Sequence, residues 1–177
     1  MKNILLLFAL ILTACSNGER PNKIRKMETV GYSVNINASP ETVYNTMIDK
    51  EGFKKWVAVF GANAFYEGSW EKGRKMIYKS PDEKGQMQGM ISTIKENIPY
   101  KEIYIQPIGI LENGMEIYSG EKVKDLNKSF ENYLFIDNGD GTMTLKVNVA
   151  IYEELKDYFN TTWPKALKVI KEISEQK

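Results

Sequence analysis

The sequence predicts an α+β domain in which a long C-terminal helix covers one face of an antiparallel sheet. Three features predict this class. Residues 143–151 alternate apolar and polar side chains, which is typical of a strand with one buried and one solvated face. Shorter strand-like runs separated by turn residues precede it, between residues 65 and 136. From residue 163 onward the apolar residues recur at helical spacing, which indicates an amphipathic helix that can cover the sheet.

The composition is that of one folded domain. The chain has 177 residues, of which 42% are hydrophobic and 27% charged. Its net charge of +1 gives no long-range attraction to nucleic acid. The chain has no histidine, the commonest general base and metal ligand, and its one cysteine cannot form an intrachain disulfide. We therefore expect no cofactor, no metal and no nucleic-acid partner.

The first residues have the layout of an export signal. A short positive start is followed by an uninterrupted apolar run at Ile4–Leu12. This run is shorter than the ~20 apolar residues that a membrane-spanning helix needs. The alternatives are a plain cleaved signal or an N-terminal core helix.

The residues Leu12-Thr13-Ala14-Cys15 resemble the bacterial lipobox. The resemblance implies a lipid on the Cys15 sulfur and cleavage before this residue. We therefore expect a signal peptide at 1–14, a lipidated tether at 15–30 and the folded domain at 31–177. Such a protein would be a lipoprotein of the cell envelope, anchored to a bacterial membrane on an extracytoplasmic face.

The domain is predicted to begin with a strand and a short helix. Residues 32–37 alternate as a strand does. Ser39 then suits a helix N-cap and Pro40 the first helical position, so a helix is predicted from here to about Ile48. We expect Gly52 to break this helix, with a second short turn after it.

The middle of the chain is predicted to form several short strands. The predicted runs lie at 75–78, 87–94, 103–105, 115–118, 133–136 and 143–151. A hairpin loop at 137–141 joins the last two runs. The sequence leaves open whether Ile77 or Tyr78, and Ile117 or Tyr118, faces inward, because shifting a strand by one residue exchanges its two faces.

The C-terminal helix is predicted from its apolar stripe. Trp163, Leu167 and Ile170 follow the helical step. Pro164 suits the first turn of a helix, so residues 153–159 are predicted to form a separate lead-in turn.

This order of elements, together with particular motifs, resembles the START-like superfamily, also called SRPBCC or Bet v 1-like. The closest likeness is to the activator-of-Hsp90-ATPase-homologue C-terminal-like and polyketide cyclase/dehydrase group. The matching motifs lie at 38–44, Trp56, 68–70, Gly73, Gly89, 98–100, 139–142 and 163–167. The likeness covers residues 32–175.

The resemblance implies a helix-grip fold. In this fold a seven-stranded antiparallel sheet wraps around the long C-terminal helix, and a short broken helix follows the first strand. It also implies a cavity between sheet and helix that often holds an apolar ligand. It implies no single activity, because members include lipid binders, co-chaperone domains and cyclases.

Aromatic and methionine side chains are the candidates to line such a cavity, because they offer apolar surface with a few polar atoms. The candidate ligand-binding residues are Trp56, Met76, Tyr78, Met90, Tyr118, Tyr133, Phe135 and Trp163. The alternative is that each one simply fills the core. No catalytic residues are predicted, because the carboxylates considered (Glu112 and Glu116, Glu153 and Glu154, Asp82 and Glu83) fit solvated surface positions.

The leading hypothesis is a non-catalytic protein, tethered through Cys15, that binds a hydrophobic small molecule or lipid between the sheet and the last helix. The second hypothesis is a protein-interaction module with an envelope protein partner. The third is a cyclase-type enzyme. A buried Asp or Glu that points into the cavity would favour the third hypothesis.

Overall fold

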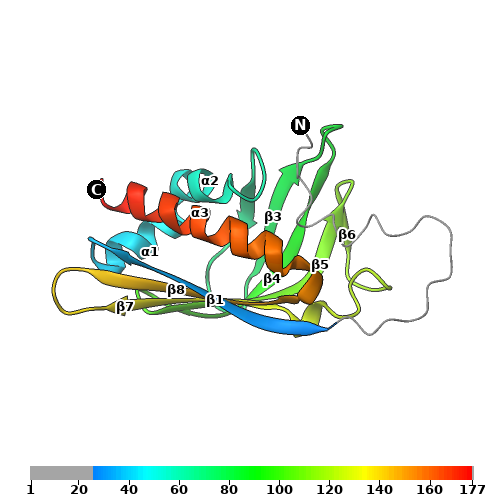
Figure 1. The fold of residues 1–177 in the computed structure, drawn as a ribbon. Helices are drawn as coiled ribbons and strands as arrows, with labels where there is room; N and C mark the ends of the chain where they lie inside the picture. Colours follow the sequence, from blue (N-terminus) through cyan, green and yellow to red (C-terminus); the bar gives the residue numbers. More distant parts are fainter. Residues whose placement is uncertain (1–25, 177) are drawn as a thin grey trace.

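The computed structural model describes residues 26–176 and confirms the predicted α+β class and the helix-grip fold. A curved antiparallel sheet carries the long C-terminal helix across one face (Figure 1). The helices are α1 (Pro40–Ile48), α2 (Lys50–Val57) and α3 (Lys156–Ser174), with 3-10 turns η1 (Leu126–Lys128) and η2 (Glu153–Leu155). The strands are β1 (Met27–Ile36), β2 (Phe65–Gly68), β3 (Lys75–Pro81), β4 (Met87–Ile98), β5 (Glu102–Glu112), β6 (Met115–Ile117), β7 (Phe130–Asp137) and β8 (Met143–Tyr152).

The sheet has one continuous path with a short extra strand. The order is β1-β8-β7-β5-β4-β3-β2, and β6 pairs with β5 beside this path. The seven strands of the path fit the number that the resemblance implies, and β6 makes eight. β1 begins at Met27, so the last four residues of the predicted tether, 27–30, pair with β8. The predicted signal peptide and Cys15 lie outside the described residues.

The broken helix is confirmed, but the residue that breaks it is not the predicted one. Ser39 caps α1 by accepting a hydrogen bond from the Thr42 amide at 3.1 Å, as expected. The chain breaks at Asp49, whose carboxylate caps α2 by accepting from the Glu51 and Gly52 amides. Gly52 lies inside α2, where a Cβ atom would come within 1.9 Å of the Thr46 carbonyl oxygen. Glycine is required here for the close packing of α2 on α1.

The C-terminal helix is longer than predicted. It begins at Lys156, directly after η2, and Pro164 lies inside it rather than in its first turn. A proline inside a helix costs about 3 kcal/mol because one backbone hydrogen bond is lost. Phe159 and Trp163 before the proline, and Leu167 after it, are buried in the core cluster, and we attribute the persistence of the helix to their packing.

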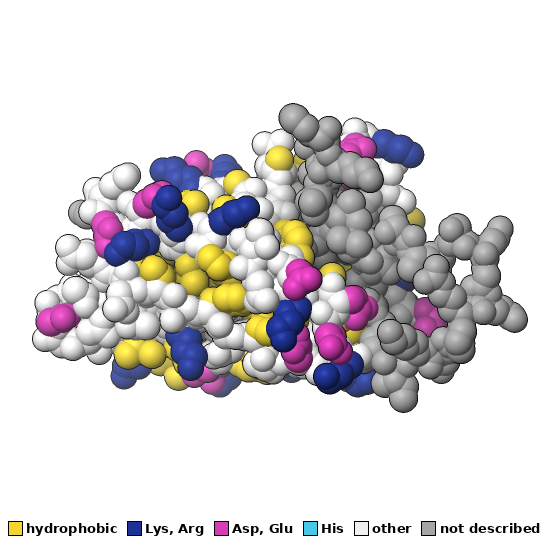
Figure 2. All heavy atoms as spheres, in the orientation of Figure 1, with side chains coloured by type: hydrophobic (Ala, Val, Ile, Leu, Met, Phe, Trp, Pro, Cys, Tyr) yellow, Lys and Arg dark blue, Asp and Glu magenta, His cyan; other side chains and the backbone are white. Residues whose placement is uncertain are grey.

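The core lies between the inner face of the sheet and α3. Leu145, Val147 and Val149 of β8 point inward and are at most 1% exposed, as their alternation predicts. They belong to one cluster with Trp163 and Ile170 of α3. Figure 2 shows a band of hydrophobic side chains along the line between α3 and β1. Within residues 26–176, no helix combines the length and apolarity needed to cross a membrane.

Candidate functional site

An internal cavity of about 130 Å³ lies between the inner face of the sheet and helices α2 and α3. Its walls are largely aromatic and include Trp56, Trp70 and Trp163, which are all the tryptophans of the chain. An engineered cavity of about 150 Å³ holds a benzene molecule, so this volume suits one small ring. The β6–β7 connection closes part of the cavity through Leu126.

Trp163 organises the aromatic wall. Its ring stacks on Trp56 at a centroid distance of 6.3 Å and meets Phe60 edge to face at 4.9 Å. Tyr133 approaches it from β7 at 5.9 Å. The helical step on α3 places Trp163 over the sheet, and its side chain is 1% exposed. These rings fix one another and form a rigid apolar surface.

Five of the eight sequence-predicted residues line the cavity: Trp56, Tyr78, Met90, Tyr133 and Trp163. Met76 and Phe135 are buried in the adjoining core and do not line it. The undecided strand phases are resolved. Tyr78 faces the cavity while Ile77 joins a small cluster on the other face, and Ile117 packs inward beside Met90.

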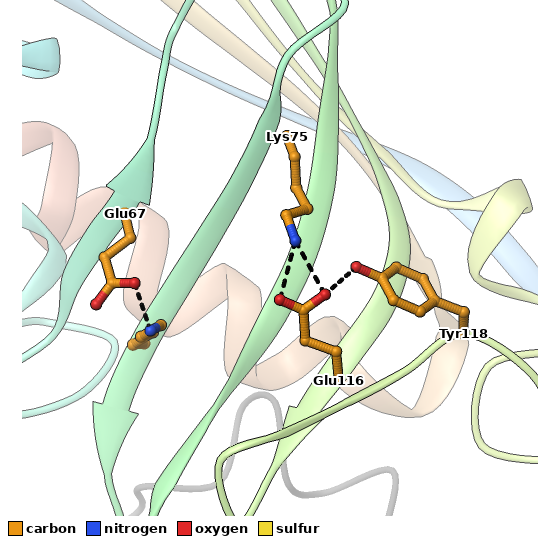
Figure 3. A network of polar contacts seen from close by, with 5 residues as sticks. Glu67, Lys75, Glu116 and Tyr118 are labelled. Carbon is orange, nitrogen blue, oxygen red and sulfur yellow. Dashed lines mark hydrogen bonds and ion pairs between the residues drawn. The ribbon is translucent and has the colours of Figure 1, made fainter.

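Tyr118 lies outside this cavity and is 48% exposed. Its hydroxyl donates a hydrogen bond to Glu116, which Lys75 of β3 also binds at 2.9 and 3.0 Å (Figure 3). The hydrogen bond from Tyr118 and then the Lys75 ammonium lower the pKa of Glu116. Lys79 and Glu67 form a further ion pair nearby, at 2.6 Å (Figure 3). This network belongs to the solvated face and ties β6 to β3.

Glu131 lines the cavity and was missed by the sequence analysis. It lies two residues before Tyr133 on β7, so both side chains emerge on the inner face. Its neighbours in the sheet, Val149 and Ile105, are buried on that face. The Tyr133 hydroxyl donates a hydrogen bond to Glu131 Oε2 at 2.6 Å. The alternation of the sequence contains the signal for this position. Extending the predicted strand at 133–136 by two residues toward the N-terminus would have placed Glu131 on the inner face of the sheet.

The cavity gives this carboxyl an unusual environment. Burial raises the pKa of Glu131, and the hydrogen bond from Tyr133 opposes this only in part. Burial, and then the charge of Glu131, hold the pKa values of Tyr133 and Tyr78 well above their usual range. Among the described residues that line the cavity, Glu131 is the only Asp, Glu, Lys or Arg. No cation of the described protein compensates it inside the cavity.

Several polar atoms around the cavity lack protein partners. The Tyr78 hydroxyl and the indole N–H groups of Trp70 and Trp163 are buried without a hydrogen-bond partner within residues 26–176. Trp56 differs, because its indole N–H donates to the Met47 carbonyl at 3.1 Å. Buried polar groups are normally satisfied. The site is thus an apolar cavity with a few polar atoms that a ligand could bind.

A metal centre does not emerge in the described part of the chain. Residues 26–176 contain no group of three or more His, Cys, Asp or Glu side chains placed to hold an ion. Of the carboxylates expected at the surface, Glu112 pairs with Lys122 and Glu153 with Lys26.

Solved structures share this fold at low sequence identity. The solution structure of the Aha1 dimer from Colwellia psychrerythraea matches with a TM-score of 0.61 and 18% identity, over 84% of this chain and 96% of that chain. A protein from Nitrosomonas europaea matches with a TM-score of 0.61 and 12% identity, over 84% and 94%. A conserved protein of unknown function from Enterococcus faecalis matches with a TM-score of 0.57 and 10% identity, over 84% and 72%. No curated protein matches the sequence.

The sequence itself matches a family description. The family of the "Activator of Hsp90 ATPase homolog 1-like protein" matches residues 37–175, from the residue pair before the cap of α1 to the end of α3. This range includes every element that lines the cavity. The chain therefore belongs to the Activator of Hsp90 ATPase homolog 1-like family, within the START-like superfamily.

Proposed function

We propose that the domain binds a hydrophobic small molecule, or the apolar part of a lipid, in the cavity between the sheet and α3. The observation that carries this proposal is the aromatic chamber of about 130 Å³ with a single carboxyl and unpartnered polar atoms in its walls. Ligand sites are typically apolar chambers with a few polar groups that orient the guest. The family and its fold support the proposal, since START-like proteins bind hydrophobic ligands or protein partners.

A cavity-filling variant tests this proposal. Ser92 of β4 lines the cavity and is 1% exposed, so Ser92→Leu places a larger apolar side chain inside it. Thr93→Leu is the matched control, because the next residue of the strand points to the other face. Both variants should stay folded. The probe is benzyl alcohol, a single ring with one hydroxyl.

Binding is measured by tryptophan fluorescence, because all three tryptophans line the cavity. We expect a saturable change with the wild-type protein and Thr93→Leu, and none with Ser92→Leu. No saturable change in the wild type, or equal binding by a folded Ser92→Leu protein, would refute the proposal. If the wild type binds the probe as expected, native mass spectrometry after incubation with a lipid extract of the source cells identifies the natural ligand class.

Tethering to a membrane through Cys15 is part of the same proposal. The lipobox-like residues Leu12–Cys15 support it. A single acyl chain anchors a protein only marginally, so stable anchoring needs more than one. We expect Cys15→Ala to leave the domain folded and to move it from the membrane fraction to the soluble fraction. Lipidation would be contradicted if Cys15→Ala stayed in the membrane fraction and differed from the wild type in mass only by the substituted side chain.

A protein-interaction module is the second candidate, and the family description favours it. Met115 and Tyr118 at β6 offer apolar surface, being 65% and 48% exposed. This role predicts that Met115→Asp weakens cross-linking to an envelope partner while Ser92→Leu leaves it intact. The cyclase-type alternative gains the half-buried carboxyl of Glu131 in the cavity wall, but carboxylate acid–base catalysis uses a second group of different pKa. Among the described residues, no second carboxyl lines the cavity.

A further inference from the structure

We propose that the guest is a small hydrophobic amine, bound as its ammonium ion with Glu131 as counter-ion. This inference rests on the proposed function and names the ligand class of the same cavity. It is argued from the charge, the hydrogen bonding, the walls and the size of the site.

The charge of the site selects against anions. Glu131 is the only charged group among the described residues that line the cavity, and neither lysine nor arginine accompanies it. A buried carboxylate without a cation is costly unless a partner compensates it. A cationic guest supplies that partner, whereas an anionic guest adds a second uncompensated charge.

The hydrogen bonds of Glu131 leave room for a donor. Tyr133 donates to Oε2 at 2.6 Å and is the one protein donor to this carboxyl within residues 26–176. An ionised carboxylate offers about four acceptor sites. The Tyr78 hydroxyl, which is unpartnered within the same residues, also carries lone pairs that an N–H group can use. An ammonium group brings three donors, so one guest nitrogen can satisfy both residues.

The walls suit a cation that carries an apolar body. Ring faces attract an ammonium group through their quadrupole, and the effect is larger where water is excluded. Trp56, Phe60 and Trp163 form one aromatic wall, with ring centroids 4.9 to 6.3 Å apart. Phe53 adjoins this wall at Trp56, with ring centroids 5.0 Å apart, and stacks on Tyr78 at 5.9 Å. The volume of about 130 Å³ limits the guest to roughly one ring with a short amine arm.

Three single-ring probes of similar size test the assignment. Benzylamine is a cation at pH 7.5, benzyl alcohol is neutral and benzoate is an anion. With the wild-type protein we expect benzylamine to bind at least tenfold more tightly than benzyl alcohol, and benzoate not to bind. A tenfold ratio corresponds to about 1.4 kcal/mol. The titrations use the tryptophan fluorescence assay described above.

Two variants test whether Glu131 is the group that binds the ammonium ion. Glu131→Gln should weaken benzylamine at least tenfold and leave benzyl alcohol within about twofold, since one charge–charge contact and no packing is removed. Glu116→Gln removes a carboxylate of the solvated face and should change neither affinity. Equal binding of amine and alcohol by the wild type, or benzylamine binding that survives Glu131→Gln, would overturn the amine assignment while the hydrophobic-ligand proposal stands. Tight benzoate binding would overturn it equally, and a failure of all three probes would refute both proposals.

Discussion

Replacing Glu131 with glutamine should change the pH dependence of stability in a defined direction. Burial raises the pKa of Glu131 in the folded protein above that of a solvated glutamate, which is about 4.3. Below pH 4 the carboxyl is protonated in both the folded and the unfolded chain and contributes no pH dependence. As pH rises toward the folded pKa, the unfolded chain releases its proton first, so the wild-type protein loses stability. Above the folded pKa the loss is constant.

The magnitude follows from linkage. Each unit by which the folded pKa exceeds the unfolded one corresponds to about 1.4 kcal/mol. In a domain of this size, 1 kcal/mol shifts the melting temperature by about 2–4 °C. We therefore expect the melting temperature of Glu131→Gln, minus that of the wild type, to rise between pH 4 and pH 8. Only the change with pH is informative, because the new amide alters the hydrogen bond from Tyr133 equally at every pH.

The measurement is a series of thermal melts by circular dichroism between pH 4 and pH 8. Tyr78 and Tyr133 face the carboxyl and stay protonated throughout this range, because burial raises their pKa values. Glu116→Gln is the control of opposite sign, since the hydrogen bond from Tyr118 and the Lys75 ammonium lower the pKa of Glu116. The wild type should lose the stabilisation from that contact as pH falls from about 4.3, the pKa of a solvated glutamate, through the lowered pKa of Glu116, so the melts for this control extend below pH 4. A constant difference for Glu131→Gln, or one that shrinks with rising pH, would refute the buried-carboxyl reasoning.

Four further substitutions test the packing and the cap of α1 by urea denaturation. Trp163→Ala should lower the free energy of unfolding by about 3–5 kcal/mol, since it removes a buried ring; a loss under 1 kcal/mol would contradict its role in the wall. Gly52→Ala should cost more than about 3 kcal/mol, because its Cβ would lie 1.9 Å from the Thr46 carbonyl oxygen. Gly61→Ala, with its nearest neighbour at 3.8 Å, should change stability by less than about 1 kcal/mol. Ser39→Ala should cost about 1 kcal/mol through the lost cap, and no change would show that the Thr42 amide finds another acceptor.

Local chemistry made much of the fold predictable. The Ser39-Pro40 pair predicts the start of α1, and the alternation of apolar and polar residues in β8 predicts both the strand and its buried face. Such signals depend on neighbours in sequence. The position of Gly52 depends instead on the approach of α2 to the Thr46 carbonyl, and the position of Pro164 on contacts with the sheet. Proline and glycine read in isolation therefore marked the wrong helix ends.

The sequence predicted the aromatic character of the candidate site better than it predicted which side chains line the cavity. Aromatic side chains in the right elements were recognised, but strand phase decides which of them reach the cavity. Tyr118 lies two residues beyond the pairing position of Glu116 and turns to the solvated face. Glu131 was overlooked because a charged residue beside the apolar run Tyr133–Ile136 resembles a strand end. Only the pairing of β7 with β5 and β8 places its side chain on the inner face, where it is half-buried.

The pairing of β1 with β8 determines where the preceding chain joins the domain. Met27 lies opposite Tyr152, and Tyr152 lines the cavity, whereas α3 ends at Ser174, far along the helix from its first turns (Figure 1). The lipid anchor proposed at Cys15 would therefore join the domain at the end where Tyr152 lines the cavity. For the same reason, an affinity tag for binding studies belongs at the C-terminus.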